Sequence, residues 1–122
     1  MEFKIPFRLM GLNEYINLNR ICKFEASSTK KELEEKIAFF LHGKVTEPVH
    51  ITFVWFEPNR RRDKDNVAFG KKFILDALQK KGVLPNDNNK WVSGFTDEFV
   101  YGQGEGVIVT LEPDEIVEAR HE

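Results

Sequence analysis

The sequence predicts an α+β fold, in which a mixed β-sheet carries two principal helices packed on it. Segments whose apolar residues recur at every second position alternate along the chain with segments whose apolar residues recur at helical intervals. The order is strand, helix, strand, helix and then two or three further strands, with no internal repeat or linker. This order favours helices packed on one sheet.

The chain opens with a predicted strand and continues into a predicted helix. Apolar side chains alternate with polar ones or proline over residues 3–9, and Pro6 places this strand near a sheet edge. Residues 11–24 are mixed and Asn-rich, and we assign no element there. Thr29 opens a capping box and is followed by apolar residues at helical intervals up to Gly43, so the first helix is expected to begin at Thr29.

The second half of the chain repeats the strand-to-helix order. Residues 49–56 are apolar on both faces, which predicts a central strand. A second helix is expected from Asp65 to Lys81, and Gly82 supplies a left-handed end. The remaining strands are expected at residues 91–95 and 98–101, as a ribbon, and at residues 107–111.

Composition indicates one soluble domain. The chain has 122 residues, of which 31% are charged and 41% hydrophobic, and this length suits a single core. We expect a domain over residues 1–111 and an acidic tail over residues 112–122. No apolar run reaches membrane-spanning length, no secretory signal is visible, and the single Cys22 cannot form an internal disulfide. A cytoplasmic protein without a membrane partner is therefore expected.

Charge is unevenly distributed along the chain. The net charge is −2, yet residues 59–91 contain nine Lys or Arg against four Asp, a local balance of +5. The last eleven residues contain five acids and one arginine, a balance of −4. A basic middle of this kind is compatible with a polyanionic partner, although charge runs are often only solvated faces.

Residues 60–66 read Arg-Arg-Arg-Asp-Lys-Asp-Asn, which sets three guanidinium groups beside two carboxylates. Arginine matches phosphate oxygens with paired donors, and closely spaced carboxylates are the hard ligands that Mg²⁺ or Mn²⁺ prefers. The motif therefore predicts metal-dependent chemistry on a phosphodiester. The competing interpretation is that Asp65 or Asn66 caps the following helix and that the arginines form a solvated loop.

Two further residues extend this candidate site. In a continuous helix starting at Asp65, Lys72 lies about 20° from the same meridian and Lys71 about 120° away. Lys72 is thus the candidate cation for phosphate charge, and Asp76 on the same face is a candidate partner for it. Asp87 follows the second helix in a turn-forming stretch, where a turn Asp usually bonds locally.

The run of residues 61–66, with the later Asp76-Ala77-Leu78, Gly82 and Asp87, resembles the RusA family of Holliday junction resolvases. The Gly11-Leu12-Asn13 turn and the Lys30-Lys31 pair also resemble the family, so the likeness covers most of residues 1–111. The family places a lysine four residues after its second aspartate, where this chain has Phe69. Aligning instead from Asp76 brings Lys72 to that role.

The resemblance implies a RusA-like fold and a small homodimeric nuclease, often of prophage origin, that nicks four-way DNA junctions symmetrically in recombination and repair. It implies that Asp63, Asp65 and Asp87 are catalytic and bind Mg²⁺, with Mn²⁺ as a substitute, and that Lys72 is catalytic. The candidates for DNA contact are Arg60, Arg61, Arg62, Lys30 and Lys31.

Two other functions compete with the resolvase. One is a non-catalytic DNA-junction-binding protein, in which the acids are structural and only the basic stretch functions. The other is a small interaction module whose arginines bind an acidic protein.

Overall fold

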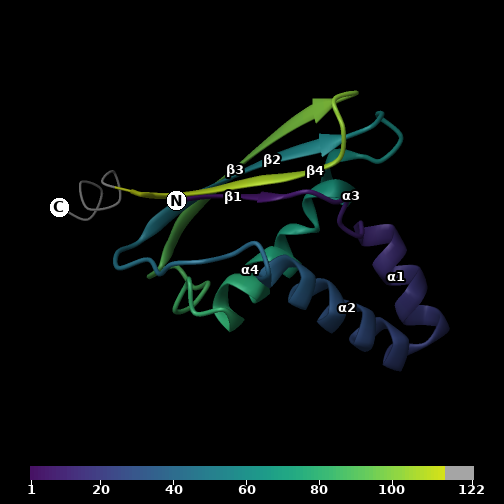
Figure 1. Cartoon of the computed structure of the whole chain (residues 1–122). Helices are drawn as coiled ribbons and strands as arrows, with labels where there is room; N and C mark the ends of the chain where they lie inside the picture. The colour runs from purple at the N-terminus through teal and green to yellow at the C-terminus, as the bar shows by residue number, and fades with distance from the viewer. Residues whose placement is uncertain (115–122) are drawn as a thin grey trace.

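The computed structural model describes residues 1–114 and has two layers, a sheet and a set of helices that cover one face of it (Figure 1). The sheet has four strands in the order β1-β4-β2-β3, with β2 and β3 parallel and the other pairs antiparallel. The predicted α+β class with a mixed sheet is confirmed. The strands are β1 (Glu2–Ile5), β2 (Val49–Glu57), β3 (Val92–Tyr101) and β4 (Gly106–Pro113). The helices are α1 (Leu12–Ile21), α2 (Lys23–Ala38), α3 (Lys64–Ala68) and α4 (Lys71–Lys80).

The strand β2 is central, as its apolar sequence predicts. It lies between β4 and β3, and its side chains from Val49 to Trp55 at odd positions are almost fully buried against the helices. Phe53 and Trp55 stack with ring centroids 5.5 Å apart. The core is thus built on the helix-facing side of β2, and the candidate motif begins three residues beyond its end.

The first strand is shorter than its alternating pattern predicts. β1 ends at Ile5 because Pro6 has no N–H to continue the ladder with β4. The apolar Phe7 and Leu9 instead belong to the segment that leads into α1, and Leu9 is buried against Gly70. The alternating apolar pattern therefore continues past the end of β1, because Phe7 and Leu9 pack against the core although they are not in the strand.

The helical half of the molecule differs from the prediction at both of its first elements. α1 was not assigned from sequence, and none of its residues is fully buried, although partly buried Tyr15 packs against Phe69 and Phe73. α2 begins at Lys23 after an extended Cys22, which places Thr29 inside the helix and not at its start. Buried Ala26 extends the packed face one turn before Thr29, so tertiary burial outweighs the local capping pattern.

The predicted helix over residues 65–81 is two helices in the structure. α3 ends at Ala68 and α4 begins at Lys71, with hydrogen bonds of the i to i+3 type from Gly70 N to Val67 O and from Phe73 N to Gly70 O. A Cβ on Gly70 would lie 3.1 Å from Leu9 Cβ and 3.2 Å from Trp55 Cζ3. Gly70 therefore lets the chain approach the sheet closely at this break. Gly82 ends the helical region with φ +79°, as predicted.

The predicted ribbon at residues 91–95 and 98–101 is wrong. Both segments belong to the single strand β3, which pairs in parallel with β2 through Thr96 and Asp97. These polar residues resemble a turn in sequence, but an edge strand accommodates them because one side of it faces water. β4 continues to Pro113, two residues into the predicted acidic tail. The rest of that tail, residues 115–122, lies outside the described residues.

Candidate nucleic-acid and metal site

The loop after β2 is anchored by Arg62. Its Nε and Nη2 donate to the two carboxylate oxygens of Glu57 at 2.7 Å each, and its Nη1 donates to Leu9 O at 3.1 Å. The side chains are 12% and 5% exposed, so this is a buried and bidentate ion pair. Glu57 was not identified from sequence, although its place at an inward position of a buried strand, three residues before an arginine run, was the available signal.

This anchoring changes the assignment of Arg62. Its donors are already occupied by Glu57, Leu9 and, at 3.5 Å, by Glu14, so the guanidinium is not free to bind a phosphate. We correct its expected role from DNA contact to positioning of the loop. Arg60 and Arg61 remain exposed at the surface.

Gly11, Leu12 and Asn13, expected as a turn, form the N-terminus of α1 and lie directly against the motif. Asn66 Oδ1 accepts a hydrogen bond from Asn13 N at 2.9 Å, and a Cβ on Gly11 would lie 2.6 Å from the same oxygen. Only glycine permits this approach at position 11. Two separate parts of the sequence likeness thus meet in space and fix the start of α3.

Asp63 and Asp65 are exposed at the start of α3. Asp63 is the N-cap residue, but its side chain makes no capping hydrogen bond, and Asn66 bonds to Asn13 and not to its own helix. Among residues 1–114, neither carboxylate has a hydrogen bond or a salt bridge. The interpretation that Asp65 or Asn66 caps the helix therefore has no support in the side-chain geometry.

Asp87 lies apart, in the loop after α4. It lines a hollow of about 290 Å³ together with Lys72, Asp76 and the apolar side chains of Phe69 and Leu75. Oxygen donors of this type suit Mg²⁺, but among the described residues no three His, Cys, Asp or Glu side chains are grouped to hold a metal ion. The side-chain positions in this structure therefore do not form a three-carboxylate metal site.

The two neighbouring lysines of α4 have different surroundings. Lys71 Nζ lies 2.7 Å from Asp97 Oδ2, whereas Lys72 is exposed and lines the hollow with Asp87. The helical projection that favoured Lys72 assumed one continuous helix, and the break at Gly70 removes its basis. The proximity of Lys72 to Asp87 now supports the same choice.

The predicted partner of Lys72 is bound elsewhere. Asp76 forms a salt bridge with Lys30 at 3.1 Å, and Lys30 also contacts buried Glu34 at 3.4 Å. Burial opposes the charge of Lys30, but the hydrogen bonds and negative charges of Asp76 and Glu34 outweigh it and raise the Lys30 pKa above 10.5. Lys30 thus connects α2 to α4, while Lys31 is exposed.

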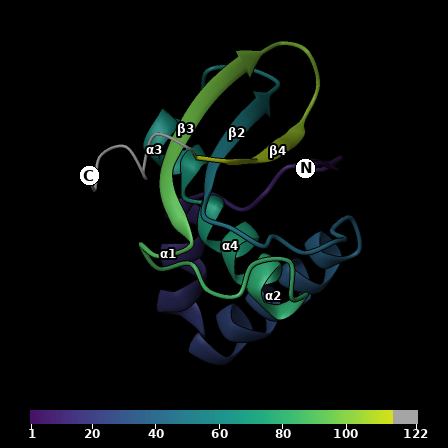
Figure 2. The ribbon, with the colours of Figure 1, turned by 90° about the vertical axis from the view of Figure 1, so that its left-hand side faces the viewer.

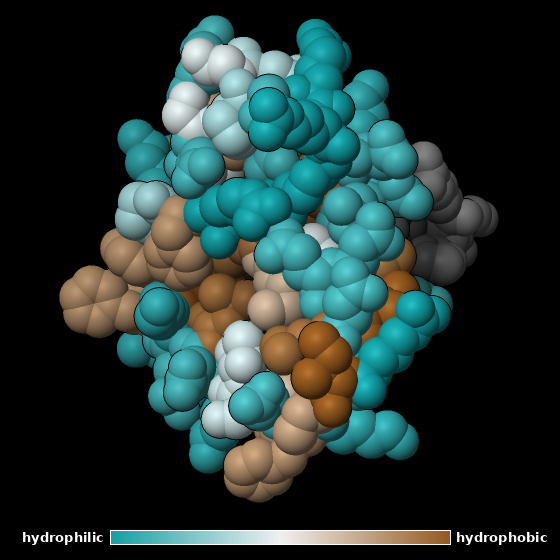
Figure 3. All heavy atoms as spheres, turned by 90° about the vertical axis from the view of Figure 1, so that its right-hand side faces the viewer, coloured by the Kyte–Doolittle hydropathy of each residue, from teal (hydrophilic) through white to brown (hydrophobic). Residues whose placement is uncertain are grey.

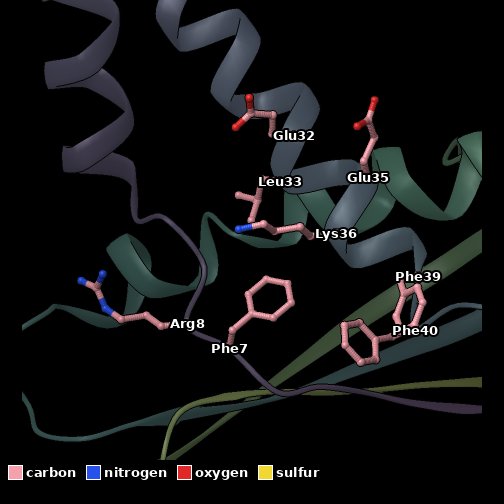
Figure 4. A pocket seen from close by; sticks show the side chains of 8 residues that line it. All are labelled: Phe7, Arg8, Glu32, Leu33, Glu35, Lys36, Phe39 and Phe40. Atoms are coloured by element: carbon pink, nitrogen blue, oxygen red, sulfur yellow. The ribbon is translucent and has the colours of Figure 1, made fainter.

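A second hollow, of about 880 Å³, has no residue of the acidic motif in its lining. Phe7, Leu33 and Phe40 point into it, and charged groups of both signs stand at its rim (Figure 4). It is apolar and contains no cluster of nucleophilic or metal-binding groups, so its chemistry suits a hydrophobic contact and not phosphodiester cleavage.

Neither a scan against protein-family models nor a search of curated proteins finds a match to this chain. Within residues 1–114, no helix combines the length and the hydrophobicity needed to cross a membrane.

Proposed function

We propose that this protein is a metal-dependent endodeoxyribonuclease that resolves Holliday junctions and other branched DNA by paired nicks. The observation that carries the proposal is the pair of exposed carboxylates, Asp63 and Asp65, beside the exposed Arg60 and Arg61. Their loop is fixed by a buried ion pair that leaves these four side chains at the surface. Fixed polar groups on a rigid support are what phosphate chemistry requires.

In this proposal Arg60, Arg61 and Lys31 contact the DNA backbone, which orients the duplex without reading its sequence. Asp63, Asp65 and Asp87 would hold Mg²⁺, or Mn²⁺ in its place. A bound ion of this kind activates water and offsets phosphate charge. Lys72 would contact the negative charge that develops on the phosphate.

The proposed metal site requires Asp87 and the start of α3 to approach each other when DNA or metal binds. All three carboxylates are exposed. Among residues 1–114, none of them forms a hydrogen bond or a salt bridge that would have to break before it could move. Mutual repulsion of ionised carboxylates opposes their approach without a cation and favours it with one. Mg²⁺ is therefore expected to strengthen DNA binding as well as to permit cleavage.

A homodimer is part of the proposal because a four-way junction has two-fold symmetry and needs two opposed nicks. Figure 3 shows hydrophobic side chains gathered around a hollow on one side of the molecule. Phe39 stands at the rim of the apolar hollow with 81% of its surface exposed. The mixed charges of Arg8, Glu35 and Lys36 around it suit a second copy of the same surface.

The experiment is incubation of the purified chain with a labelled four-way junction or a linear duplex of matched length, in Mg²⁺ or in EDTA. The proposal expects symmetric nicks in the junction only, and only with metal. Binding to the junction without nicks in Mg²⁺ or Mn²⁺ would instead support the non-catalytic junction-binding protein. That second candidate is favoured by one observation, the absence of a grouped three-carboxylate site among residues 1–114.

A further inference from the structure

Three cationic side chains lie over three aromatic rings along the edge strand β3. Arg60 Cζ is 4.1 Å from the Tyr101 ring centroid, Lys64 Nζ is 5.7 Å from that of Phe99, and Lys71 Nζ is 4.6 Å from that of Phe95. We call these six residues the β3 ladder. Among residues 1–114, β3 pairs with β2 alone, and Figure 2 shows it as the outermost strand of the sheet.

The register of β3 explains why the ladder is continuous. Residues 95, 97, 99 and 101 pair with inward-facing positions of β2, so they share the helix-facing side of the sheet. From Phe95 to Tyr101 the strand advances about 20 Å. Along β3 from Phe95 to Tyr101, the cations come from α4, from α3 and from the loop before α3, in that order.

Two of the three cations are available to a ligand. Within residues 1–114, neither Arg60 nor Lys64 has a salt-bridge partner, and both are exposed. A ring contact uses the face of a guanidinium and leaves its in-plane N–H donors free. Lys71 differs because it forms a salt bridge with Asp97. The Asp97 carboxylate also accepts a hydrogen bond from Trp55 Nε1 at 2.9 Å.

Phe95 is the exposed aromatic surface of the ladder. It is 43% exposed although it is large and apolar, and buried Phe53 supports it with centroids 6.0 Å apart. A fixed and exposed ring beside a row of cations is the combination by which proteins hold single strands. Bases stack on the ring, and cations contact the phosphates.

We infer that the β3 ladder binds a single-stranded segment of DNA, with Phe95 as a stacking surface for a base and with Arg60 and Lys64 as phosphate contacts. The inference extends the proposed function to the path of one unpaired strand beside the acidic motif. Asp97 and the nearby Asp63 and Asp65 repel phosphates, so the strand is expected to follow the edge of β3 and to approach those acids only with a cation present.

The test measures binding of a fluorescein-labelled oligothymidine of about twelve nucleotides by anisotropy, with the full chain in EDTA. Phe95→Ala is expected to weaken binding at least about fivefold, because stacking is worth roughly 1–3 kcal/mol per base. Phe95→Leu, which keeps an apolar side chain but removes the ring, is expected to weaken it similarly. Phe24→Ala, a matched change of a phenylalanine in α2 that is 82% exposed, should leave binding unchanged.

The salt dependence tests the cations separately. Lys64→Ala is expected to reduce the slope of log K against log salt by about 0.7, whereas the exposed Lys23→Ala should leave it unchanged. Thermal melting of each variant checks that it is folded. No oligothymidine binding by the wild-type chain, or wild-type affinity in the folded Phe95→Ala and Phe95→Leu variants, would overturn the inference.

These outcomes are distinct from those of the nuclease assay. If the chain nicks junctions but binds oligothymidine equally well without the Phe95 ring, the proposed role of the β3 ladder is wrong and the proposed nuclease activity stands. If the chain binds oligothymidine through Phe95 but does not nick junctions in Mg²⁺ or Mn²⁺, the proposed nuclease activity is wrong and the proposed role of the β3 ladder stands.

Discussion

Arg61 and Arg62 are neighbours in sequence but have opposite surroundings, which makes them a matched pair for a test of stability. Arg62→Ala leaves the buried Glu57 carboxylate without its bidentate partner. We expect the free energy of unfolding to fall by about 3 kcal/mol, whereas Arg61→Ala, at an exposed side chain, should change it by less than about 0.5 kcal/mol. Urea unfolding measures both values.

A double variant separates the lost ion pair from other effects of the substitution. Replacing both Arg62 and Glu57 by leucine removes the buried charges together, and we expect it to regain most of the stability lost in Arg62→Ala. Equal stability of Arg61→Ala and Arg62→Ala would contradict the anchoring role of Arg62.

The two lysines of α4 test the chemistry of the site. Lys72 lines the hollow with Asp87, while Lys71 is paired with Asp97. At saturating junction DNA, Lys72→Ala is therefore expected to lower the cleavage rate more than Lys71→Ala, by about tenfold or more. Single-turnover cleavage measures the rate without product release, and equal losses in the two variants would remove Lys72 from the catalytic set.

Among the secondary-structure elements, the break between α3 and α4 gives a test of close packing. Gly70→Ala adds a methyl group within 3.1–3.2 Å of Leu9 and Trp55. Alanine favours helix by about 1 kcal/mol over glycine, but overpacking costs about 1–3 kcal/mol. We expect a net loss of about 1 kcal/mol in the free energy of unfolding.

A double-mutant cycle checks the cause of that loss. Leu9→Ala removes the Cδ1 atom that the new methyl group would meet, so Gly70→Ala should cost less in that background. Additive losses would show that the Leu9 contact is not what requires glycine at this position.

The elements that sequence predicted correctly depend on local pattern. The strand β2 is apolar at its inward positions from Val49 to Trp55, and Gly82 has the positive φ expected at a helix end. The β3 strand was divided because its parallel partner lies more than forty residues earlier in the chain, and no local signal reports that pairing. α1 was missed because none of its residues is fully buried and the asparagines between its apolar residues weaken the helical pattern.

In the candidate site, too, the features that depend on local sequence could be predicted and those that depend on distant contacts could not. Asp63, Asp65 and the exposed arginines follow from one short motif and are exposed as a binding site requires. The role of Arg62 did not follow, because its partner Glu57 lies in a buried strand. The β3 ladder depends on the register of β3 with β2 and on three separate elements, so neither the rings nor their cations were grouped from sequence.

At the scale of the whole molecule, the proposal requires two copies of the chain. Light scattering at micromolar concentration is expected to give about twice the 14.2 kDa chain mass. Phe39→Asp places a charge at the rim of the apolar hollow and should shift the protein toward the monomer, while Phe95→Asp on the β3 edge should not. A wild-type monomer that makes both nicks in one encounter would contradict the dimer.

The central claim is that Asp63 and Asp65 perform metal-dependent cleavage of branched DNA. Its most direct measurement is the rate of junction cleavage in Mg²⁺ beside junction affinity in EDTA, for Asp63→Asn, Asp65→Asn and the exposed control Glu25→Gln. The account predicts at least about a 100-fold loss of cleavage in both aspartate variants, more than loss of an orienting group usually costs. It also predicts unchanged or tighter binding, because negative charge facing the phosphates is removed. The control should behave as the wild type. Wild-type cleavage by either aspartate variant would contradict the account.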